Sequence, residues 1–216
     1  MQKENRPFDI QAASRLGGVS EYYFSRKLKE VAQMNAEGKN VISLAIGSPD
    51  MPPSDNAIQE LCSQAWNPDG HGYQSYTGIP ELRQGFASWY KKWYDVHLNP
   101  ANEILPLIGS KEGILHITLA FVNPGEQVLV PDPGYPTYRS LSRLLGADVV
   151  PYDLKEENGW LPDLEELEKA DLSKVKLMWV NYPNMPTGAN ATRELYRRLV
   201  DFAYRNNIVV VNDNPY

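Results

Sequence analysis

The sequence predicts an α/β fold in which a mostly parallel sheet is sandwiched between helices. Two observations predict it: short apolar runs suited to buried strands recur along the chain, and segments of helical periodicity separate them. Strands that alternate with helices pair in parallel and are covered on both faces. The length of 216 residues allows one sizeable domain, or one domain plus part of another.

The first half of the chain contains three predicted helices, at 20–37, 55–65 and 80–94. In the first of them, Phe24, Leu28 and Val31 recur at the spacing of one helix face, and Gly38 suits its end. The run VISLAI (41–46) predicts a strand. The polar, proline-rich segment that follows it predicts a turn.

From residue 104 onward the two patterns alternate regularly. Strands are predicted at 104–109, 127–131, 147–154, 176–181 and 208–211. Helices are predicted between them at 111–122, 136–146, 163–170 and 192–206. In the last helix Leu195, Leu199 and Phe202 lie on one face, which predicts an amphipathic helix packed on the sheet.

Four of these strands end in polar turns: GSKEG (109–113), PDPGYPTY (131–138), NYPNMPTG (181–188) and NDNPY (212–216). Each alone is an ordinary turn, because Gly, Pro and Asn form turns everywhere. Ligands of parallel sheets bind beyond the carboxyl ends of the strands, so four such turns at one edge predict a site there. The two X–Pro bonds of NYPNMPTG allow cis peptides in this tight segment.

Composition argues against several kinds of partner. A net charge of −6 without a Lys/Arg cluster argues against nucleic acid, and the apolar runs are too short to span a bilayer. Cys62 is the only cysteine, which excludes an intrachain disulfide and fits a reducing cytoplasm. No metal site is expected, because the three histidines lack ligand spacing: His71, His97 and His116.

Six segments occur in the order of the motifs of class I/II aminotransferases. They are GSPD (47–50), GYQSYTGIPELR (72–83), GSKEGI (109–114), PDPGYPTY (131–138), NYPNMPTGA (181–189) and NDNPY (212–216). From about Ala13 to Tyr216 the chain resembles this family of fold type I enzymes, which use pyridoxal 5′-phosphate (PLP). The resemblance implies an aspartate aminotransferase-like large domain at 46–216, and an N-terminal arm with part of the small domain at 1–45.

Gly109, Ser110 and Lys111 form a predicted strand-to-helix turn. Backbone N–H groups at a helix N-terminus bind phosphate, the Ser110 hydroxyl can add a bond, and Gly109 lets the backbone approach closely. The resemblance implies that this segment holds the PLP phosphate and that Lys111 serves the phosphate. The alternative interpretation is an ordinary capped helix N-terminus that binds no ligand, since the same residues would suit it.

Three further residues are implied to contact the PLP ring. Tyr135 matches the family aromatic that stacks on it, a role suited to a rigid ring at a strand end. Asp213 faces the pyridine nitrogen and keeps it protonated, which makes the ring an electron sink. Tyr216 matches the tyrosine that donates to the phenolic O3′. Asp213 and Tyr216 are therefore the catalytic candidates. Taken alone, Tyr135 would be interpreted as a packed surface tyrosine, and Asp213 as an ordinary aspartate in a turn after a strand.

One position departs from the family pattern. The family has Asn immediately before Pro-Thr-Gly, where it bonds O3′, whereas this chain has Met185, which donates no hydrogen bond. Asn184, one residue earlier, is the candidate contact in its place. Asn181 at the strand end could compensate instead, or Tyr216 could hold O3′ alone.

Two candidates lie in the first half of the chain. The spacing of Tyr73 ahead of Gly78 matches the family tyrosine that bonds the cofactor phosphate of the neighbouring subunit, which implies a homodimer. Gly47 matches the family glycine beside the substrate carboxylate.

The function implied is that of a PLP-dependent amino-acid aminotransferase acting on an amino acid and a 2-oxo acid. The family's Schiff-base lysine lies one strand beyond the NDNPY position, so we expect the chain to be the first part of such an enzyme. Another fold type I enzyme, such as a carbon–sulfur lyase or an aminocyclopropane-carboxylate synthase, shares these motifs. Two further hypotheses are a regulator that uses an aminotransferase-like domain as a sensor, and a noncatalytic fragment that binds PLP weakly.

Overall fold

The computed structural model describes residues 10–18, 21–44, 47 and 50–216. The chain divides into two compact units: residues 1–20 together with 107–216, and residues 21–106. The predicted division into 1–45 and 46–216 refers to the family's domains and stays a prediction.

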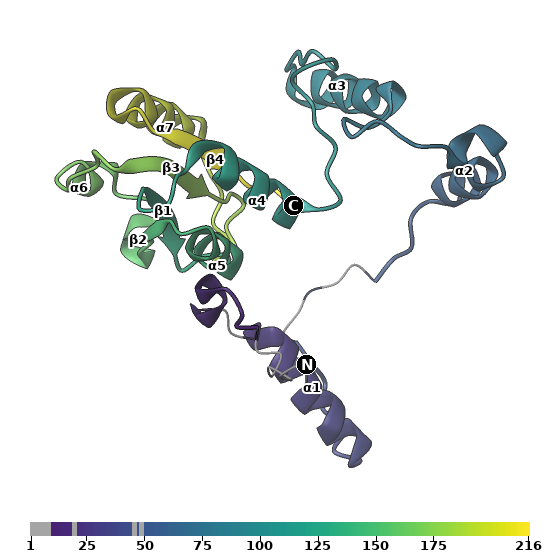
Figure 1. Ribbon diagram of the computed structural model, residues 1–216, viewed down its shortest axis with the longest axis horizontal. Coiled ribbons are helices and arrows are strands. Elements are labelled where there is room, and N and C mark those ends of the chain that lie inside the picture. The colour runs from purple at the N-terminus through teal and green to yellow at the C-terminus, as the bar shows by residue number, and fades with distance from the viewer. Residues whose placement is uncertain (1–9, 19–20, 45–46, 48–49) are drawn as a thin grey trace, which may run out of the picture. The chain divides into compact units, whose positions relative to one another are not determined.

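The larger unit is built on a four-stranded parallel sheet in the order β2-β1-β3-β4 (Figure 1). Its strands are β1 (Gln127–Asp132), β2 (Asp148–Asp153), β3 (Val175–Val180) and β4 (Val209–Asn212). All three pairings are parallel, because a helix returns the chain between successive strands. The predicted α/β class is confirmed.

Helices cover both faces of this sheet. They are α4 (Ser110–Phe121), α5 (Pro136–Leu144), α6 (Leu164–Leu167) and α7 (Arg193–Asn206), with short 3-10 helices η1 (Ser14–Gly18) and η3 (Glu156–Asn158). Successive strand residues face opposite sides: Val128 and Val130 pack with α4 and α5, whereas Leu129 packs with α6 and α7. The sheet is therefore the middle of three layers.

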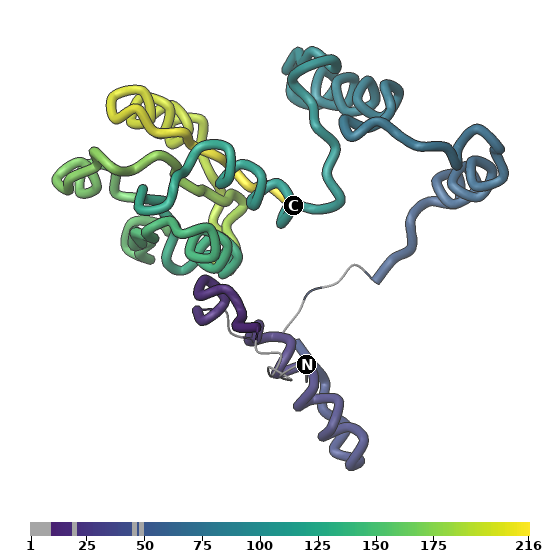
Figure 2. Tube along the Cα trace, viewed as in Figure 1, coloured from purple at the N-terminus to yellow at the C-terminus, as the bar shows by residue number. Residues whose placement is uncertain are grey.

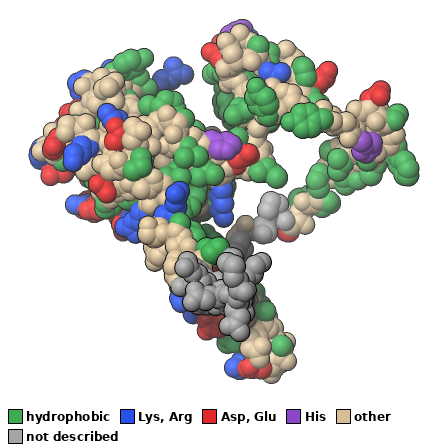
Figure 3. Space-filling model, viewed as in Figure 1, with side chains coloured by type: hydrophobic (Ala, Val, Ile, Leu, Met, Phe, Trp, Pro, Cys, Tyr) green, Lys and Arg blue, Asp and Glu red, His purple; other side chains and the backbone are tan. Residues whose placement is uncertain are grey.

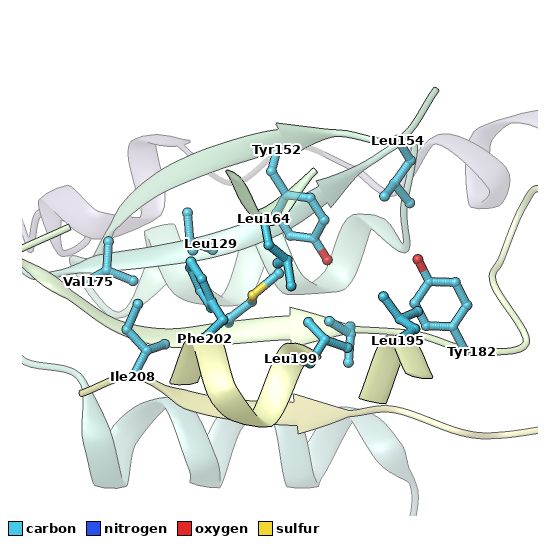
Figure 4. Packing of buried hydrophobic residues seen from close by; sticks show 12 residues of the cluster. Leu129, Tyr152, Leu154, Leu164, Val175, Tyr182, Leu195, Leu199, Phe202 and Ile208 are labelled. Carbon is cyan, nitrogen blue, oxygen red and sulfur yellow. The ribbon is translucent and has the colours of Figure 1, made fainter. Parts of the chain in front are cut away.

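The α7 face of the sheet shows how the predicted amphipathic pattern is used. Leu195, Leu199 and Phe202 are buried and point from α7 toward the strands (Figure 4). Thr192 caps this helix, since its hydroxyl accepts a hydrogen bond from the N–H of Leu195 at 3.1 Å. The three apolar residues of α7 that were predicted to face the sheet are therefore the ones buried in the core.

The unit of residues 21–106 is helical. It contains α1 (Tyr23–Ala36), α2 (Asp55–Ala65), the 3-10 helix η2 (Pro68–His71) and α3 (Pro80–Tyr94), which confirms the three predicted helices. Within this unit Phe86, Trp89 and Trp93 of α3 are exposed. Figure 3 shows hydrophobic side chains interspersed with polar ones on the molecular surface. Among the described residues, no helix is both long enough and apolar enough to cross a membrane.

Two predicted strands are wrong where the structure describes them. Residues 41–44 form no strand, and Ile42 and Leu44 are 84% and 92% exposed; residues 45–46 lie outside the described part of the chain. Residues 104–109 also form no strand. An apolar run becomes a strand only where a neighbour takes its hydrogen bonds, and the described sheet ends at β2 and β4 without pairing to either segment.

Smaller differences also follow from packing. The predicted helix at 163–170 shortens to the single turn of α6. The last strand was predicted to be buried, yet its valines are only half-buried, because β4 forms an edge of the described sheet.

Truncating the α7 stripe is expected to destabilise the fold. Leu199→Ala in the complete protein should lower the free energy of unfolding by about 2–5 kcal/mol, because it leaves a cavity at a fully buried position. Val200→Ala, at the exposed neighbouring position, should change it by less than about 0.5 kcal/mol. Chemical denaturation of both variants measures the difference. Equal losses would contradict the packing described for α7.

Candidate active site

The carboxyl ends of β1, β3 and β4 and the start of α4 surround one pocket of about 220 Å³. In Figures 1 and 2 the carboxyl terminus of the chain lies beside the start of α4. The lining residues are Ser110, Tyr135, Tyr138, Asn181, Met185, Asp213, Pro215 and Tyr216. The sheet therefore brings together four predicted site residues that are up to 106 positions apart in the sequence.

Asp213 is held by three hydrogen bonds. Its backbone N–H donates to the carbonyl of Val180 at 2.9 Å, which extends the pairing of β3 with β4. Its own carbonyl accepts from Asn181 Nδ2 at 2.6 Å, and its carboxylate Oδ2 accepts from the Tyr138 hydroxyl at 2.8 Å. Both its backbone and its side chain are therefore fixed at the pocket.

Asn181 ties two of the strand-end loops together. Besides donating to Asp213, this buried side chain accepts from the N–H of Met185 at 2.7 Å through Oδ1. The loop after β3 and the loop after β4 are thus joined by one amide. Both ends of the Asn181 amide hold these loops, and each end retains a second hydrogen-bonding position.

Tyr138 is fully buried behind the carboxylate. Its ring lies parallel to that of Trp179, with centroids 5.2 Å apart and planes 5° apart, and it meets Tyr135 edge-on at 5.5 Å. Burial raises the pKa of the Tyr138 hydroxyl well above its ordinary value, and the Asp213 carboxylate raises this pKa further. The hydroxyl is therefore a neutral donor.

Tyr135 stands at the start of α5, where its backbone is extended. The preceding turn is tight: a Cβ on Gly134 would lie 2.6 Å from the carbonyl oxygen of Pro131, so only glycine fits there. The ring of Tyr135 is half-buried and lines the pocket, as the stacking role predicted for it requires.

The start of α4 is the candidate anion-binding element of the pocket. Ser110 is its first residue, and within the described structure no side chain caps this 12-residue helix at Gly109. The N-terminus of a helix suits an anion, and in this turn the N–H of Glu112 donates to the carbonyl of Gly109 at 3.1 Å. Gly109 is in extended backbone, and a Cβ there would meet no atom within 4 Å, so protein packing does not require a glycine at this position. Lys111 follows in the first turn and is exposed.

Asn184 is placed apart from the pocket lining. It is buried, and its Oδ1 accepts from the Thr187 hydroxyl at 2.7 Å, which braces the turn. Met185, the departure from the family pattern, is the residue of this segment that reaches the pocket beside Asn181. Both X–Pro bonds of the segment are cis, as predicted. A contact of Asn184 with the cofactor stays a prediction.

Gly47 and Tyr73 belong to the unit of residues 21–106 and are exposed. Their predicted contacts, with the substrate carboxylate and with the partner's cofactor phosphate, stay predictions. In the parts of the chain that the structure describes, no group of His, Cys, Asp and Glu side chains is arranged to hold a metal ion.

Tyr138 is the pocket residue that sequence reasoning missed. The sequence feature that could have indicated Tyr138 is its spacing, because a residue three positions after Tyr135 lies next to it on the first turn of α5. Its partner Asp213 is 75 residues away, and no local pattern connects the two positions.

Comparison with known proteins identifies the family. The model of aminotransferase class I and II matches residues 39–216. This chain belongs to the class I and II aminotransferase family. An LL-diaminopimelate aminotransferase of Dehalococcoides mccartyi is 44% identical over 207 residues, and one of Oleidesulfovibrio alaskensis is 46% identical over 204. These alignments cover 96% and 94% of this chain, and 53% of each relative.

Solved structures agree with this assignment. Apo-BacF from Bacillus subtilis matches with a TM-score of 0.89 and 37% identity, over 95% of this chain and 52% of that one. The alanine aminotransferase from Pyrococcus furiosus matches with a TM-score of 0.85 and 29% identity, over 94% and 52%. The chain thus spans about half the length of the relatives that it matches.

Membership of the aminotransferase family implies PLP as the cofactor, and the pocket fits that group. The N-terminus of α4 suits a phosphate through its helix dipole and the Ser110 hydroxyl, and the fixed carboxylate of Asp213 suits a protonated pyridine nitrogen. Tyr135 offers a flat ring, and the Tyr216 hydroxyl is a donor for a phenolic oxygen. Each part of PLP therefore has a chemically suitable residue within one pocket.

Proposed function

We propose that the complete protein is a PLP-dependent aminotransferase that moves an amino group between an amino acid and a 2-oxo acid. The observation that carries this proposal is the single pocket in which Ser110, Tyr135, Asp213 and Tyr216 meet. Its donors, its aromatic ring and its carboxylate correspond one by one to the phosphate, ring, pyridine nitrogen and phenolic oxygen of PLP. The proposal assigns residues 46–216 to the large, PLP-binding domain.

The named relatives suggest the first substrate to test. Several LL-diaminopimelate aminotransferases are 42–46% identical to this chain over nearly all of its length. LL-diaminopimelate, paired with a 2-oxo acid, is therefore the proposed substrate class. The described pocket residues serve the cofactor, so they do not by themselves select one amino acid.

Different residues of the chain would bind different parts of the cofactor. When bound, PLP supplies an electron sink for the negative charge that develops at the substrate Cα. Asp213 holds a proton on the pyridine nitrogen, Tyr216 donates to the phenolic oxygen, and the start of α4 with Ser110 and Lys111 holds the phosphate. Tyr135 covers one face of the ring and limits its tilt.

The proposed assembly is a homodimer in the cytoplasm. Tyr73 supports the dimer, because it matches a residue that in the family bonds the phosphate in the neighbouring subunit. The single cysteine, Cys62, is compatible with a reducing compartment.

Removing the Asp213 carboxylate tests the function directly. Asp213→Ala in the complete protein should lower the rate of transamination by about 10²–10³, the range for losing a catalytic electrostatic contact. Asp201→Ala, an exposed acidic position on α7, is the matched control and should leave the rate unchanged. A steady-state assay with LL-diaminopimelate compares them. Wild-type turnover in Asp213→Ala would remove Asp213 from the site.

The position of the covalent lysine is a second test. Borohydride reduction of the complete protein with PLP should attach the pyridoxyl group to a lysine outside residues 1–216, because Lys111 is proposed to serve the phosphate. Peptide mapping by mass spectrometry locates the label. A label on Lys111 would reverse the roles assigned at the start of α4.

Subunit exchange tests the assembly. Tyr73→Phe subunits mixed with Asp213→Ala subunits should regain activity, because in the hybrid both lesions fall on one site and leave the other intact. Each variant alone, taken through the same exchange, is the control. If Tyr73 served its own subunit's site, each hybrid site would carry one lesion and mixing would restore nothing.

A further inference from the structure

The side chain of Asp213 is fixed by a residue outside the predicted set. The Tyr138 hydroxyl donates to its Oδ2 at 2.8 Å, and this contact joins α5 to the loop after β4 across 75 residues of sequence. Tyr138 is only 1% exposed, so water does not compete strongly for its hydroxyl, while Asp213 is half-buried at the pocket.

The ring of Tyr138 is immobilised by its neighbours. Trp179, itself fully buried in β3, stacks on one face at 5.2 Å with planes 5° apart, and Tyr135 meets the ring edge-on at 5.5 Å. Two aromatic contacts at once allow the ring little rotation, so its hydroxyl is aimed at a fixed point. That point is the carboxylate of Asp213.

Other buried tyrosines of the same unit differ in what they hold. The hydroxyl of Tyr152 donates to the carbonyl of Trp179 at 2.7 Å, and that of Tyr182 donates to the carbonyl of Trp160 at 2.9 Å. Both satisfy backbone groups and stabilise the fold. Tyr138 instead donates to an ionisable side chain that lines the candidate active site.

We propose that Tyr138 is a positioning residue that acts through Asp213: its hydroxyl holds Oδ2 and so presents the other carboxylate oxygen to the pyridine nitrogen of PLP. This inference rests on the proposed function. Without the hydroxyl the carboxylate would rotate among several orientations, and one rotamer would have to be selected each time the cofactor binds. A hydrogen bond to a charged acceptor is among the stronger ones in proteins.

Tyr138 suits this role chemically because it stays neutral. Burial, with a further contribution from Asp213, raises the pKa of its hydroxyl well above the ordinary value. It therefore donates to the carboxylate throughout the pH range in which the enzyme would work, and it does not supply the proton that the ring nitrogen carries.

A double-mutant cycle separates positioning from packing. The dissociation constant of PLP is measured by absorbance titration of the complete apo-protein as wild type, Tyr138→Phe, Asp213→Ala and the double variant. Tyr138→Phe should weaken PLP binding by roughly threefold to tenfold, part of the effect expected for one hydrogen bond to a charged group. In the Asp213→Ala background, the same change should have no further effect.

Tyr152→Phe is the matched control, because it removes a buried tyrosine hydroxyl that does not touch Asp213. It should leave the PLP dissociation constant unchanged in both backgrounds. Replacing Tyr138 with 4-aminophenylalanine, which keeps the ring and restores a donor, should recover most of the lost affinity. Thermal unfolding of each apo-protein verifies that the compared variants are folded. If Tyr138→Phe does not fold, the 4-aminophenylalanine variant takes its place in the double-mutant cycle.

The outcomes distinguish this inference from the proposed function. An equal loss from Tyr138→Phe in both backgrounds, or no loss in either while Asp213→Ala weakens binding, overturns the positioning role alone. Unchanged PLP affinity in Asp213→Ala overturns the assignment of Asp213, and the positioning role with it. A 4-aminophenylalanine variant as weak as Tyr138→Phe also contradicts the role.

Discussion

The parallel pairing of β3 with β4 is the constraint on which the candidate site depends. It ends in a backbone hydrogen bond from the N–H of Asp213 to the carbonyl of Val180. The Asn181 side-chain amide donates a further hydrogen bond to the carbonyl of Asp213. These bonds set where the chain leaves the sheet. The position of the Asp213 carboxylate, and of the pocket that it lines, follows from that exit point.

The layers on the two faces of the sheet have different parts in this arrangement. α6 and α7 close an apolar core whose members are aliphatic and aromatic, and that core holds the strands in place. On the opposite face, α4 and α5 supply both core residues and pocket residues, since Ile114 and Tyr138 pack there while Ser110 and Tyr135 reach the pocket. The α4 and α5 layer therefore couples the packing of the fold to the geometry of the site.

Much of this was predictable from the sequence, for a physical reason. Short apolar runs and the 3.6-residue helical period are local patterns, and they predicted the four strands and their covering helices; Leu195, Leu199 and Phe202 are the example on α7. Polar turns after parallel strands predicted the edge that carries the pocket. The ordered motifs then indicated the family, which the match over residues 39–216 confirms.

What failed or was missed depends on partners distant in sequence. The apolar runs at 41–46 and 104–109 have strand-like composition, but the described sheet gives neither of them a neighbour. The contact of Tyr138 with Asp213 joins positions 75 residues apart, so no local sequence pattern predicts it. Met185 was recognised as a departure, yet only the structure shows that the side chain of the nearby Asn181 bonds the carbonyl of Asp213 and the backbone N–H of Met185.

The central claim is that this pocket holds PLP with Asp213 on its pyridine nitrogen. The most direct measurement is a crystal structure of the complete protein with PLP bound. We predict the pyridine nitrogen within about 3 Å of an Asp213 carboxylate oxygen, a hydrogen-bond distance, and the phosphate at the start of α4 beside Ser110. A phosphate bound at another helix, or a pyridine nitrogen facing a residue other than Asp213, would contradict the account.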